Sequence, residues 1–343
     1  MKSAIRFILL ITLIAACNSG NKEKKQIEGM TIGGGADTIA LKPAPDFNAD
    51  NALEYIRHQC SLDARVPGSA AHEACANWIE YEFKRLGCET SIQRTMLKGY
   101  DQEEMECINI CAKTNPESTD RILITAHWDS RQWADNDPNE ANHHQAVPAA
   151  NDGASGVAVM LELARLIQQT PLSYGVDFVC FDLEDQGTPE WVTDINEQEE
   201  RANFGFWCLG SRYWASQALA SGYHARFCIN LDMVGAHGAQ FAYEQYSMQN
   251  AAPLVDMVWR LAAQLGYSKY FQQREGGPIM DDHLMVQMYA QIPAIDIVPN
   301  VEGQRSSFGN TWHTLEDTPE NIDPATLKAV GQTLTQLLYN DND

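Results

Sequence analysis

The chain has 343 residues, of which 44% are hydrophobic and 20% charged, so it can bury a sizeable core and is not intrinsically disordered. Its formal charge of −22 argues against nucleic-acid binding, because phosphate recognition requires clusters of Lys and Arg. The same charge disfavours docking on an anionic lipid surface through protein charge. A chain of this length suits one large α/β domain or two smaller ones.

The N-terminus has the features of a targeting segment. A basic start is followed by an apolar run at 7–14, which is too short to remain as a membrane-spanning helix. Cys17 directly follows two alanines, which resembles the bacterial lipobox, where the cysteine is lipidated. We therefore expect a lipoprotein signal peptide at 1–16, a flexible tether at 17–48 and export to the periplasm as a membrane-anchored monomer. A plain cleavable signal is the alternative.

Helical spacing of apolar residues predicts helices, and alternating or β-branched runs predict strands. In chain order we expect helices at 49–59 and 71–86, paired strands at 88–97 and 106–113, a strand at 121–126, a helix at 157–168, a strand at 175–183, a helix at 211–221, a strand at 227–234, helices at 254–265 and 282–289, a strand at 294–298 and a last helix at about 324–339. This alternation predicts a three-layer α/β/α fold with a central, mostly parallel, mixed sheet. We expect residues 49–343 to form one catalytic domain.

Eight cysteines follow Cys17, and export would permit disulfides. Cys180 and Cys228 lie in apolar, strand-like runs, where a buried thiol is expected to act as a small hydrophobe. No C-x-x-C pair occurs, which argues against a thiolate zinc site. The sequence leaves any disulfide pairing open.

The strand expected at 175–183 ends in a group of acidic residues that includes Glu184 and Asp185. Open α/β sheets keep their sites at the carboxyl ends of the strands, and side chains alternate along extended chain. One of these adjacent carboxylates can therefore face a metal while the other faces a reacting proton. A solvated acidic loop is the alternative interpretation of this stretch taken alone.

Other candidate residues also follow strand ends or begin helices. They are His127, Asp152, Asp232 and, on a loop near the C-terminus, His313. Two imidazoles and several carboxylates at one edge of a sheet fit a zinc site of the kind that hydrolases use. Among the remaining histidines, His283 is expected to orient the Asp281-Asp282 turn, and His143 and His144 are expected to lie in a solvated loop. The others are expected to be surface or capping residues, namely His58, His72, His224 and His237.

Six motifs occur in a fixed order from about residue 50 to the C-terminus. They are Thr125-Ala126-His127-Trp128-Asp129-Ser130, Asn151-Asp152-Gly153-Ala154-Ser155-Gly156, Glu184-Asp185, Leu209-Gly210-Ser211-Arg212, Leu231-Asp232-Met233-Val234-Gly235 and Trp312-His313-Thr314. Together they resemble the zinc-exopeptidase superfamily, which holds both di-zinc aminopeptidases and animal-type glutaminyl cyclases. The resemblance implies the fold and a zinc site.

The two branches of this superfamily use the same ligand positions differently. The resemblance implies that an aminopeptidase would hold two zincs at five positions, which here are His127, Asp152, Asp185, Asp232 and His313, with Glu184 as the catalytic acid/base. The cyclases bind one zinc, through the equivalents of Asp152, Asp185 and His313. Asp185 stands where the family usually has Glu, so either its loop compensates for the shorter side chain or the site weakens.

Three features resemble the cyclase branch. Asp281-Asp282-His283 is similar to the cyclase Asp-Asp-His motif, and Trp312 matches the tryptophan that lines the cyclase pocket. Residues 293–299 follow this motif at the distance along the chain that the cyclases have. Asp296 stands where the animal enzymes have His, which suggests a different hydrogen-bond network.

The resemblance also implies roles for individual residues. The expected catalytic residues are Glu184, Asp232 and Asp281, and the expected substrate-binding residues are Trp312, Trp191, Asp296 and His127. For Trp191, a plain loop-packing role is the alternative. Whether Asp281 or Asp282 faces Glu184 is left open.

The function that the resemblance implies is that of a glutaminyl-peptide cyclotransferase, which converts N-terminal glutamine to pyroglutamate and releases ammonia. The attacking amine belongs to the substrate itself, so proximity replaces a metal-bound hydroxide, one zinc can polarise the amide, and Glu184 can shuttle the proton. A zinc aminopeptidase with two metals is the alternative. A peptide-binding relative without turnover is disfavoured, because Glu184 and all ligand positions are present.

Overall fold

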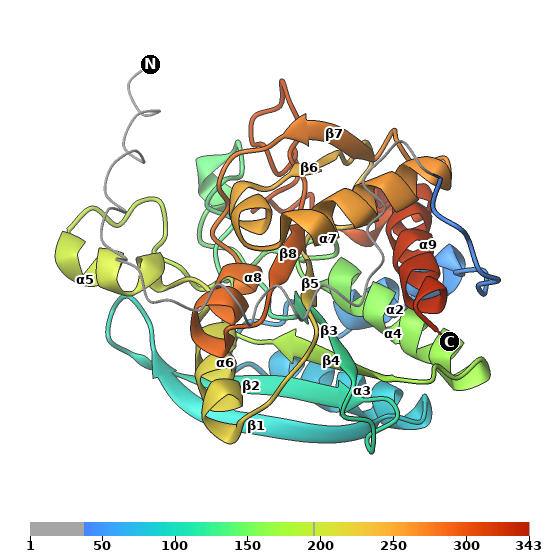
Figure 1. The fold of residues 1–343 in the computed structure, drawn as a ribbon. Helices are drawn as coiled ribbons and strands as arrows, with labels where there is room; N and C mark the ends of the chain where they lie inside the picture. The colour runs from blue at the N-terminus through green and yellow to red at the C-terminus, as the bar shows by residue number, and fades with distance from the viewer. Residues whose placement is uncertain (1–37, 195, 343) are drawn as a thin grey trace. The chain divides into compact units, whose positions relative to one another are not determined.

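A six-stranded sheet places the ends of strands from distant parts of the chain side by side (Figure 1). The computed structural model describes residues 38–194 and 196–342. The strand order is β1 (Glu89–Lys98), β2 (Glu104–Lys113), β4 (Gly175–Phe181), β3 (Arg121–His127), β5 (Cys228–Leu231) and β8 (Ala294–Ile297). The pairs β1–β2 and β2–β4 are antiparallel and the others parallel, so the predicted mixed, mostly parallel sheet is confirmed.

Helices cover both faces of this sheet, which confirms the predicted three layers (Figure 1). One face carries α2 (Ala49–Ser61), α3 (Ala70–Arg85), α4 (Ala154–Gln169), α7 (Gln245–Gln264) and α9 (Pro324–Asn340). The other face carries α6 (Leu209–Ser221), α8 (Asp282–Met285) and the π-helix Val286–Ala290. A short helix, α5 (Glu197–Ala202), lies in the segment 187–206, between the predicted strand at 175–183 and the predicted helix at 211–221.

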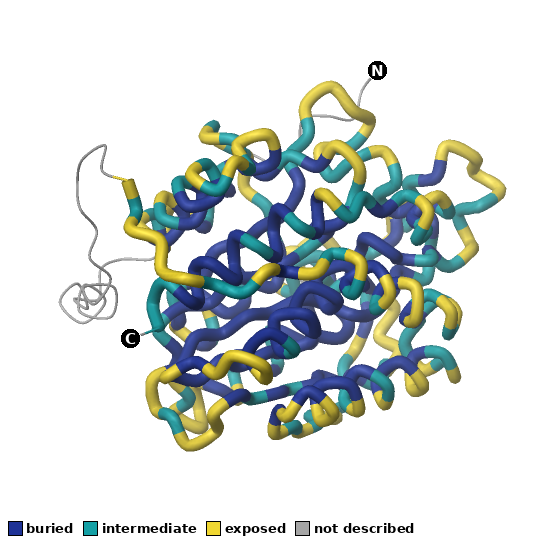
Figure 2. Tube along the Cα trace, turned by 90° about the vertical axis from the view of Figure 1, so that its right-hand side faces the viewer, coloured by how far each residue is buried: buried dark blue, intermediate teal, exposed yellow. Residues whose placement is uncertain are grey.

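The central strands are buried on both faces. Every residue of β3 and β4 is buried, as expected of parallel strands between two helical layers, whereas β1 at the sheet edge has no buried residue. Figure 2 shows the same distribution, with buried chain at the centre and exposed chain on the loops. Cys180 and Cys228 are fully buried in this core, and all eight cysteines after Cys17 are free thiols.

The structure differs from the expected elements where local signals are short or conflicting. Helix α7 starts at Gln245, well before the predicted 254, because it continues across Pro253 with a kink at Ala251; proline inside a helix is usually a stop signal. The prediction also missed a second sheet, β6 (Phe241–Tyr243) with β7 (Phe271–Glu275), whose strands are too short for a clear alternating pattern.

Residues 38–48 do not behave as the expected tether. Phe47 is 1% exposed, and its ring packs so closely on Gly331 of α9 that a Cβ there would lie 2.3 Å from it. Gln336 of α9 donates to the Lys42 carbonyl at 2.8 Å, and the Asn48 side chain caps α2. The described residues belong to one compact unit, and the expected signal peptide and Cys17 lie outside them.

Helix α4 begins at the carboxyl ends of the central strands. A Cβ on Gly156 would lie 2.4 Å from the Leu231 carbonyl of β5 and 2.7 Å from the Ala126 Cβ of β3, so only glycine permits this approach. The first turn of α4 therefore sits directly beside the ends of β3 and β5. In the part of the chain that the structure describes, no helix is both long and apolar enough to cross a membrane.

Candidate active site

Three candidate metal ligands from separate segments converge at the carboxyl ends of the strands. Asp152 precedes α4, Asp185 follows β4 by four residues, and His313 lies on the loop before α9. His313 Nε2 lies 3.0 Å from Asp185 Oδ1 and 3.6 Å from Asp152 Oδ2. All three side chains are almost fully buried, and one ligand atom of each lies within 4.8 Å of the others.

The donor atoms of this group fit a zinc ion. Asp152 Oδ2 and both carboxylate oxygens of Asp185 are buried and accept no hydrogen bond from a described residue, which is costly for a carboxylate unless a cation neutralises it. Zinc binds oxygen and nitrogen at about 2.0–2.2 Å, so ligands that share one ion lie roughly 3–4 Å apart. The separations around His313 Nε2 match that spacing.

The loop compensates for the shorter side chain of Asp185. The Asp129 carboxylate accepts hydrogen bonds from the backbone N–H groups of Glu184 and Asp185, each at 3.2 Å, and from the Gln186 side chain at 3.0 Å. These bonds hold the turn close to the strand ends. Asp185 therefore reaches His313 even though the family usually has Glu at this position.

A buried arginine that the sequence prediction missed supports two of the candidate ligands. Arg131 is 1% exposed and donates to both oxygens of Asp135, at 2.7 and 2.5 Å, and to the backbone carbonyl of Asp185 at 3.0 Å. Asp135 Oδ1 in turn lies 3.5 Å from His313 Nδ1. Burial raises the pKa of Asp135, but the bonds from Arg131 and His313 outweigh it and hold this pKa below its usual value.

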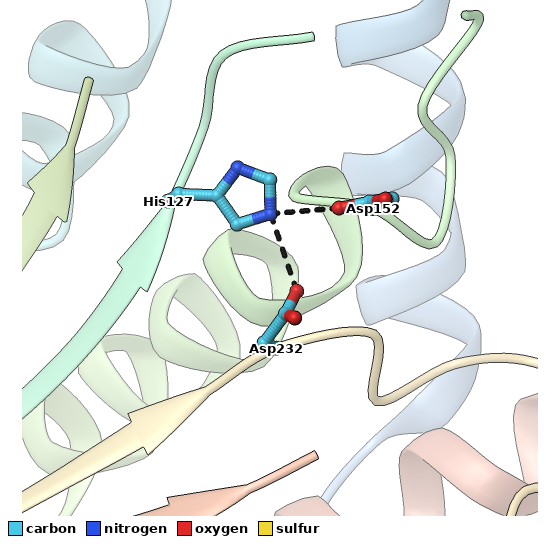
Figure 3. A group of neighbouring side chains, drawn as sticks. All are labelled: His127, Asp152 and Asp232. Atoms are coloured by element: carbon cyan, nitrogen blue, oxygen red, sulfur yellow. Dashed lines mark hydrogen bonds and ion pairs between the residues drawn. The ribbon is translucent and has the colours of Figure 1, made fainter. Parts of the chain in front are cut away.

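His127 joins two carboxylates directly (Figure 3). Its Nε2 lies 2.9 Å from Asp152 Oδ1 and 3.2 Å from Asp232 Oδ1, while its Nδ1 lies 3.4 Å from Asp129. Burial lowers the pKa of His127, but these carboxylates outweigh it and raise the pKa well above its usual value. The side chain is buried and does not line the cavity, so its direct contact with substrate stays a prediction.

Glu184 faces the cavity within a cluster of acids. Burial raises its pKa well above the usual value; His127 acts against this, and Asp185, Asp282 and Asp232 raise the pKa further. The Cys208 thiol donates to Glu184 Oε1 at 3.3 Å. Burial also raises the pKa of Asp232, to about 7. The cluster can therefore hold a proton near neutral pH.

Asp281, and not Asp282, lies beside Glu184. Carboxylate oxygens of Asp281 and Glu184 fall within 4.8 Å of each other and of the Cys208 sulfur, and Asp281 lines the cavity. Asp282 is fully buried and does not line it. Burial raises the pKa of Asp281 well above its usual value, and the carboxylates of Asp296 and Asp232 add to the rise.

Asp296 lies behind Asp281 and does not line the cavity. The Asn230 amide bridges these two residues, donating at 3.1 Å to Asp281 and at 3.2 Å to Asp296. Asp296 Oδ2 also lies 3.3 Å from His283 Nδ1, whose Nε2 lies 3.1 Å from Glu244. The structure therefore places Asp296 in a buried network behind the cavity wall, and its contact with substrate stays a prediction.

Another buried pair supports the strand end that carries Glu184. His72 Nε2 lies 3.0 Å from both oxygens of Asp182, and its ring stacks on Trp128. Asp182 Oδ1 also accepts from the Leu183 N–H at 2.9 Å. His72, expected at the surface, is 1% exposed. His72 lies on α3, and its local sequence does not predict a partner as distant in the chain as Asp182.

The cavity has a volume of about 150 Å³, with acids at one end and aromatic walls. Trp312 stacks on His313 at 4.0 Å between ring centroids, and Trp207 lies nearly parallel to His313 at 5.8 Å. Phe308 packs against Trp312 at 5.0 Å. The position of Trp312 agrees with the prediction, whereas Trp207 and Phe308 were missed.

Trp191 packs against the loop at 130–150, which agrees with a plain loop-packing role. Its ring is 38% exposed and lies 6.1 Å from Trp133 and 4.5 Å from His144 between centroids. It does not line the cavity. The chain after β4 returns at Trp207, directly before the Leu209-Gly210-Ser211-Arg212 motif, and this tryptophan supplies the wall instead.

The backbone around the cavity is held in an unusual conformation. Leu183, Met233 and His313 have φ values of 54°, 53° and 53°, in the left-handed region that side chains other than glycine rarely adopt. Each is a candidate site residue or its direct neighbour. Such conformations persist where the surrounding structure enforces them, and they gather at functional sites.

Comparison with known proteins places these features in a family. A family model described as peptidase family M28 matches residues 109–338. A Zn-dependent exopeptidase from Parabacteroides distasonis is 44% identical with a TM-score of 0.83, over 87% of this chain and 100% of that chain. A glutaminyl cyclase from Bacteroides thetaiotaomicron, solved with N-acetylhistamine, is 42% identical with a TM-score of 0.83, over 87% and 99%.

Among curated proteins, the glutaminyl-peptide cyclotransferase of Bothrops jararaca is 25% identical over 318 residues, which cover 87% of this chain and 82% of that protein. The family model covers more than half of the chain, and the ordered motifs, the sheet and the zinc-compatible residues agree with it. The chain therefore belongs to peptidase family M28, within the zinc-exopeptidase superfamily.

Proposed function

We propose that this protein is a zinc-dependent glutaminyl-peptide cyclotransferase, which converts the N-terminal glutamine of peptides and proteins to pyroglutamate and releases ammonia. The observation that carries the proposal is a difference between the two possible metal positions. Asp152 Oδ2 and Asp185 are buried without hydrogen-bond partners, beside His313. At the other position, His127 Nε2 makes a hydrogen bond of 3.2 Å with Asp232 Oδ1, whereas the 3.0 Å contact between His313 Nε2 and Asp185 Oδ1 leaves both oxygens of Asp185 without a hydrogen bond.

This asymmetry favours one metal. A di-zinc peptidase would need His127 and Asp232 to turn their donor atoms to a second ion, whereas here they face each other at 3.2 Å. One zinc held by Asp152, Asp185 and His313 leaves that pairing intact. When bound, the zinc would act as a Lewis acid on the side-chain amide of the substrate.

The residues around the metal position supply the proton transfers. The substrate's α-amine must be neutral when it attacks the amide carbon, and the departing nitrogen must be protonated to leave as ammonia. Glu184 accepts the first proton and donates it to the leaving nitrogen. Its neighbours Asp185, Asp282 and Asp232 raise its pKa further beyond the effect of burial, because adjacent carboxylates disfavour a further negative charge.

The aromatic walls position the substrate. Trp207, Phe308 and Trp312 form apolar surfaces around an acidic end, so a neutral glutamine side chain can enter while its cationic amine faces the carboxylates. Tethering of amine and amide in one molecule, together with exclusion of water, favours cyclisation over hydrolysis. The cavity of about 150 Å³ accommodates one side chain.

The cellular setting is also part of the proposal. The basic start, the apolar run at 7–14 and the cysteine after two alanines support an exported, periplasmic lipoprotein anchored through Cys17. We propose a monomer that acts on peptides and exported proteins. The charge of −22 argues against nucleic acid as a partner.

A zinc aminopeptidase is the second candidate function, favoured by one observation. All five ligand positions of the di-zinc enzymes are occupied by suitable residues, and His127, Asp152 and Asp232 form a second group with metal-ligand spacing. A modest turn of His127 would free this group.

Mass spectrometry of two peptides separates these functions. We expect a peptide beginning with glutamine to lose ammonia and keep its full length, and a matched peptide beginning with leucine to remain unchanged. Glu184→Gln should lower the cyclisation rate by about 10²–10⁴-fold while zinc stays bound. Release of free leucine or glutamine, together with about two zinc ions per chain at saturation, would identify the aminopeptidase instead.

A further inference from the structure

We propose that a second cavity, next to the catalytic one, binds a neutral side chain of the peptide that follows the N-terminal glutamine. This inference rests on the proposed function and specifies its substrates. The cavity has a volume of about 110 Å³ and lies where the chain leaves β5 and β8, at Ala236 and Pro299. It is therefore at the same edge of the sheet as the catalytic cavity.

A single aromatic wall separates the two cavities. Phe308 lines both of them, and its ring packs against Trp312 at 5.0 Å between centroids. Trp312 lines the catalytic cavity, while its chain neighbour Thr311 lines the second. A group that leaves the catalytic cavity past this wall enters the second cavity.

The rest of the bound peptide, after its N-terminal glutamine, must extend out of the catalytic cavity. Only the first residue of the peptide fits the catalytic cavity, and its carbonyl group continues into the rest of the chain. Extended chain advances about 3.3–3.6 Å per residue, and successive side chains point to opposite sides. One of the first two side chains after the glutamine can therefore point past Phe308.

The lining of the second cavity selects for a neutral group. Its floor is apolar at Ala239, Pro299 and Val301, and its rim carries the amides of Gln304 and Asn310. No Lys, Arg, Asp or Glu is among the described residues that line it. A charged side chain would lose its hydration there without gaining an ionic partner. Its binding would therefore cost more free energy than the binding of a neutral side chain.

The carboxylates of the catalytic cavity also disfavour an acidic side chain in the second cavity. Glu184, Asp232 and Asp281 lie on the other side of the Phe308 wall, and like charges across a low-dielectric wall repel. His237, the one titratable residue among the described residues of the lining, is exposed and lies 3.6 Å from Asp323. Aliphatic and small polar residues after glutamine should therefore be preferred to acidic ones.

A substitution at Val301 tests the site without touching the catalytic cavity. Val301→Trp should fill the second cavity, and Val301→Ala should leave it open as a matched control. The substrates are glutamine amide, which has nothing beyond the first residue, and tripeptides with Leu, Ser or Asp at the second or third position. We expect Val301→Trp to lower kcat/KM about 10–100-fold for the Leu peptides and less than about twofold for glutamine amide.

Each outcome points to a different conclusion. In the unmodified protein, kcat/KM should be higher for Leu than for Asp at one of the two positions, and Val301→Trp should remove that preference. Equal effects of Val301→Trp on glutamine amide and on the tripeptides would overturn the second site while leaving the cyclase intact. Failure of the unmodified protein to cyclise glutamine amide and every peptide would instead overturn the proposed function.

Discussion

At the scale of single residues, the site is governed by one buried arginine as much as by its acids. Five carboxylates line the cavity, namely Asp152, Glu184, Asp185, Asp232 and Asp281. Their repulsion must be offset by cations, and Arg131 contributes a permanent charge beside Asp185, with its Nη1 3.9 Å from Asp185 Oδ1. Its guanidinium also lies 4.6 Å from the centroid of Trp207, so the same group fixes an aromatic wall.

Arg131→Lys should weaken zinc binding. Lysine keeps the charge, but it cannot hold both oxygens of Asp135 and the Asp185 carbonyl at once. Because Asp135 faces His313 and the carbonyl belongs to Asp185, both ligands lose their support, and we expect zinc affinity to fall about 10–100-fold. Competition with a chelator measures this without any turnover assay.

The control for that substitution is Arg165→Lys, at an arginine that also pairs with a carboxylate through two hydrogen bonds, to Glu162. Arg165 lies on α4, and the zinc affinity of the Arg165→Lys variant should match that of the unmodified protein. If Arg131→Lys also leaves zinc affinity unchanged, then Arg131 does not position the ligands.

At the scale of elements, a buried histidine connects α7 to α8. Glu244 caps α7 by accepting from Tyr246 and Ser247, at 2.8 and 2.6 Å. The same carboxylate meets His283 of α8 at 3.1 Å, and the other nitrogen of this imidazole faces Asp296. The helix that carries Asp281 at its N-cap is thus fixed to the first turn of α7.

The contribution of this pair to stability should depend on pH in both directions. Burial lowers the pKa of His283, but Asp296 and Glu244 raise it to about 9 from 6.5. The stabilisation from His283 is therefore complete below pH 6.5 and is lost as the pH rises through 9. Burial raises the pKa of Glu244, but His283 and the backbone N–H groups lower it to about 2 from 4.5, so its stabilisation is lost as the pH falls from 4.5 to 2.

Urea unfolding of the unmodified protein and of His283→Gln tests this expectation. The difference in the free energy of unfolding should be largest between about pH 4.5 and 6.5 and should decline on both sides. His58→Gln, at an exposed histidine of α2, serves as the control and should show no such window. A difference that does not change with pH would mean that folding leaves the pKa of His283 at its unfolded value, so that the pair with Glu244 and Asp296 does not stabilise the protonated imidazole.

At the scale of the whole molecule, the segment before the first helix is part of the catalytic unit. Ile39 exchanges two hydrogen bonds with Gln264 of α7, at 2.9 and 2.7 Å, and the Phe47 N–H donates to Gln332 of α9 at 2.8 Å. The segment thereby joins two helices on the same face of the sheet. A boundary drawn at residue 49 would remove these contacts.

Phe47→Ala should destabilise the fold by about 3–5 kcal/mol, as expected for a fully buried phenylalanine whose loss leaves a cavity. Leu41→Ala, at a side chain that is 43% exposed, should change the free energy of unfolding by less than about 0.5 kcal/mol. Denaturant unfolding measures both. Similar small losses for the two variants would show that the segment is a tether after all.

The sequence alone determined the central sheet and the set of candidate metal ligands. Continuous apolar runs define β3, β4 and β5, and the chain must place the carboxyl ends of parallel strands at one edge. Residues such as His127 and Asp185, which directly follow those runs, are therefore brought together by topology. Local periodicity is sufficient for the sheet, whereas the full ligand set, with Asp152 and His313, was implied by the resemblance of the ordered motifs.

Only the tertiary structure decided which of these groups are partners. His72 with Asp182, Asp296 with His283, and Trp207 in place of Trp191 depend on how loops and helices fold back over many residues. No local pattern encodes such contacts, because a buried polar side chain is defined by the partner that satisfies it. The same reason explains why the docked segment at Phe47 and the support from Arg131 emerged only from the folded chain.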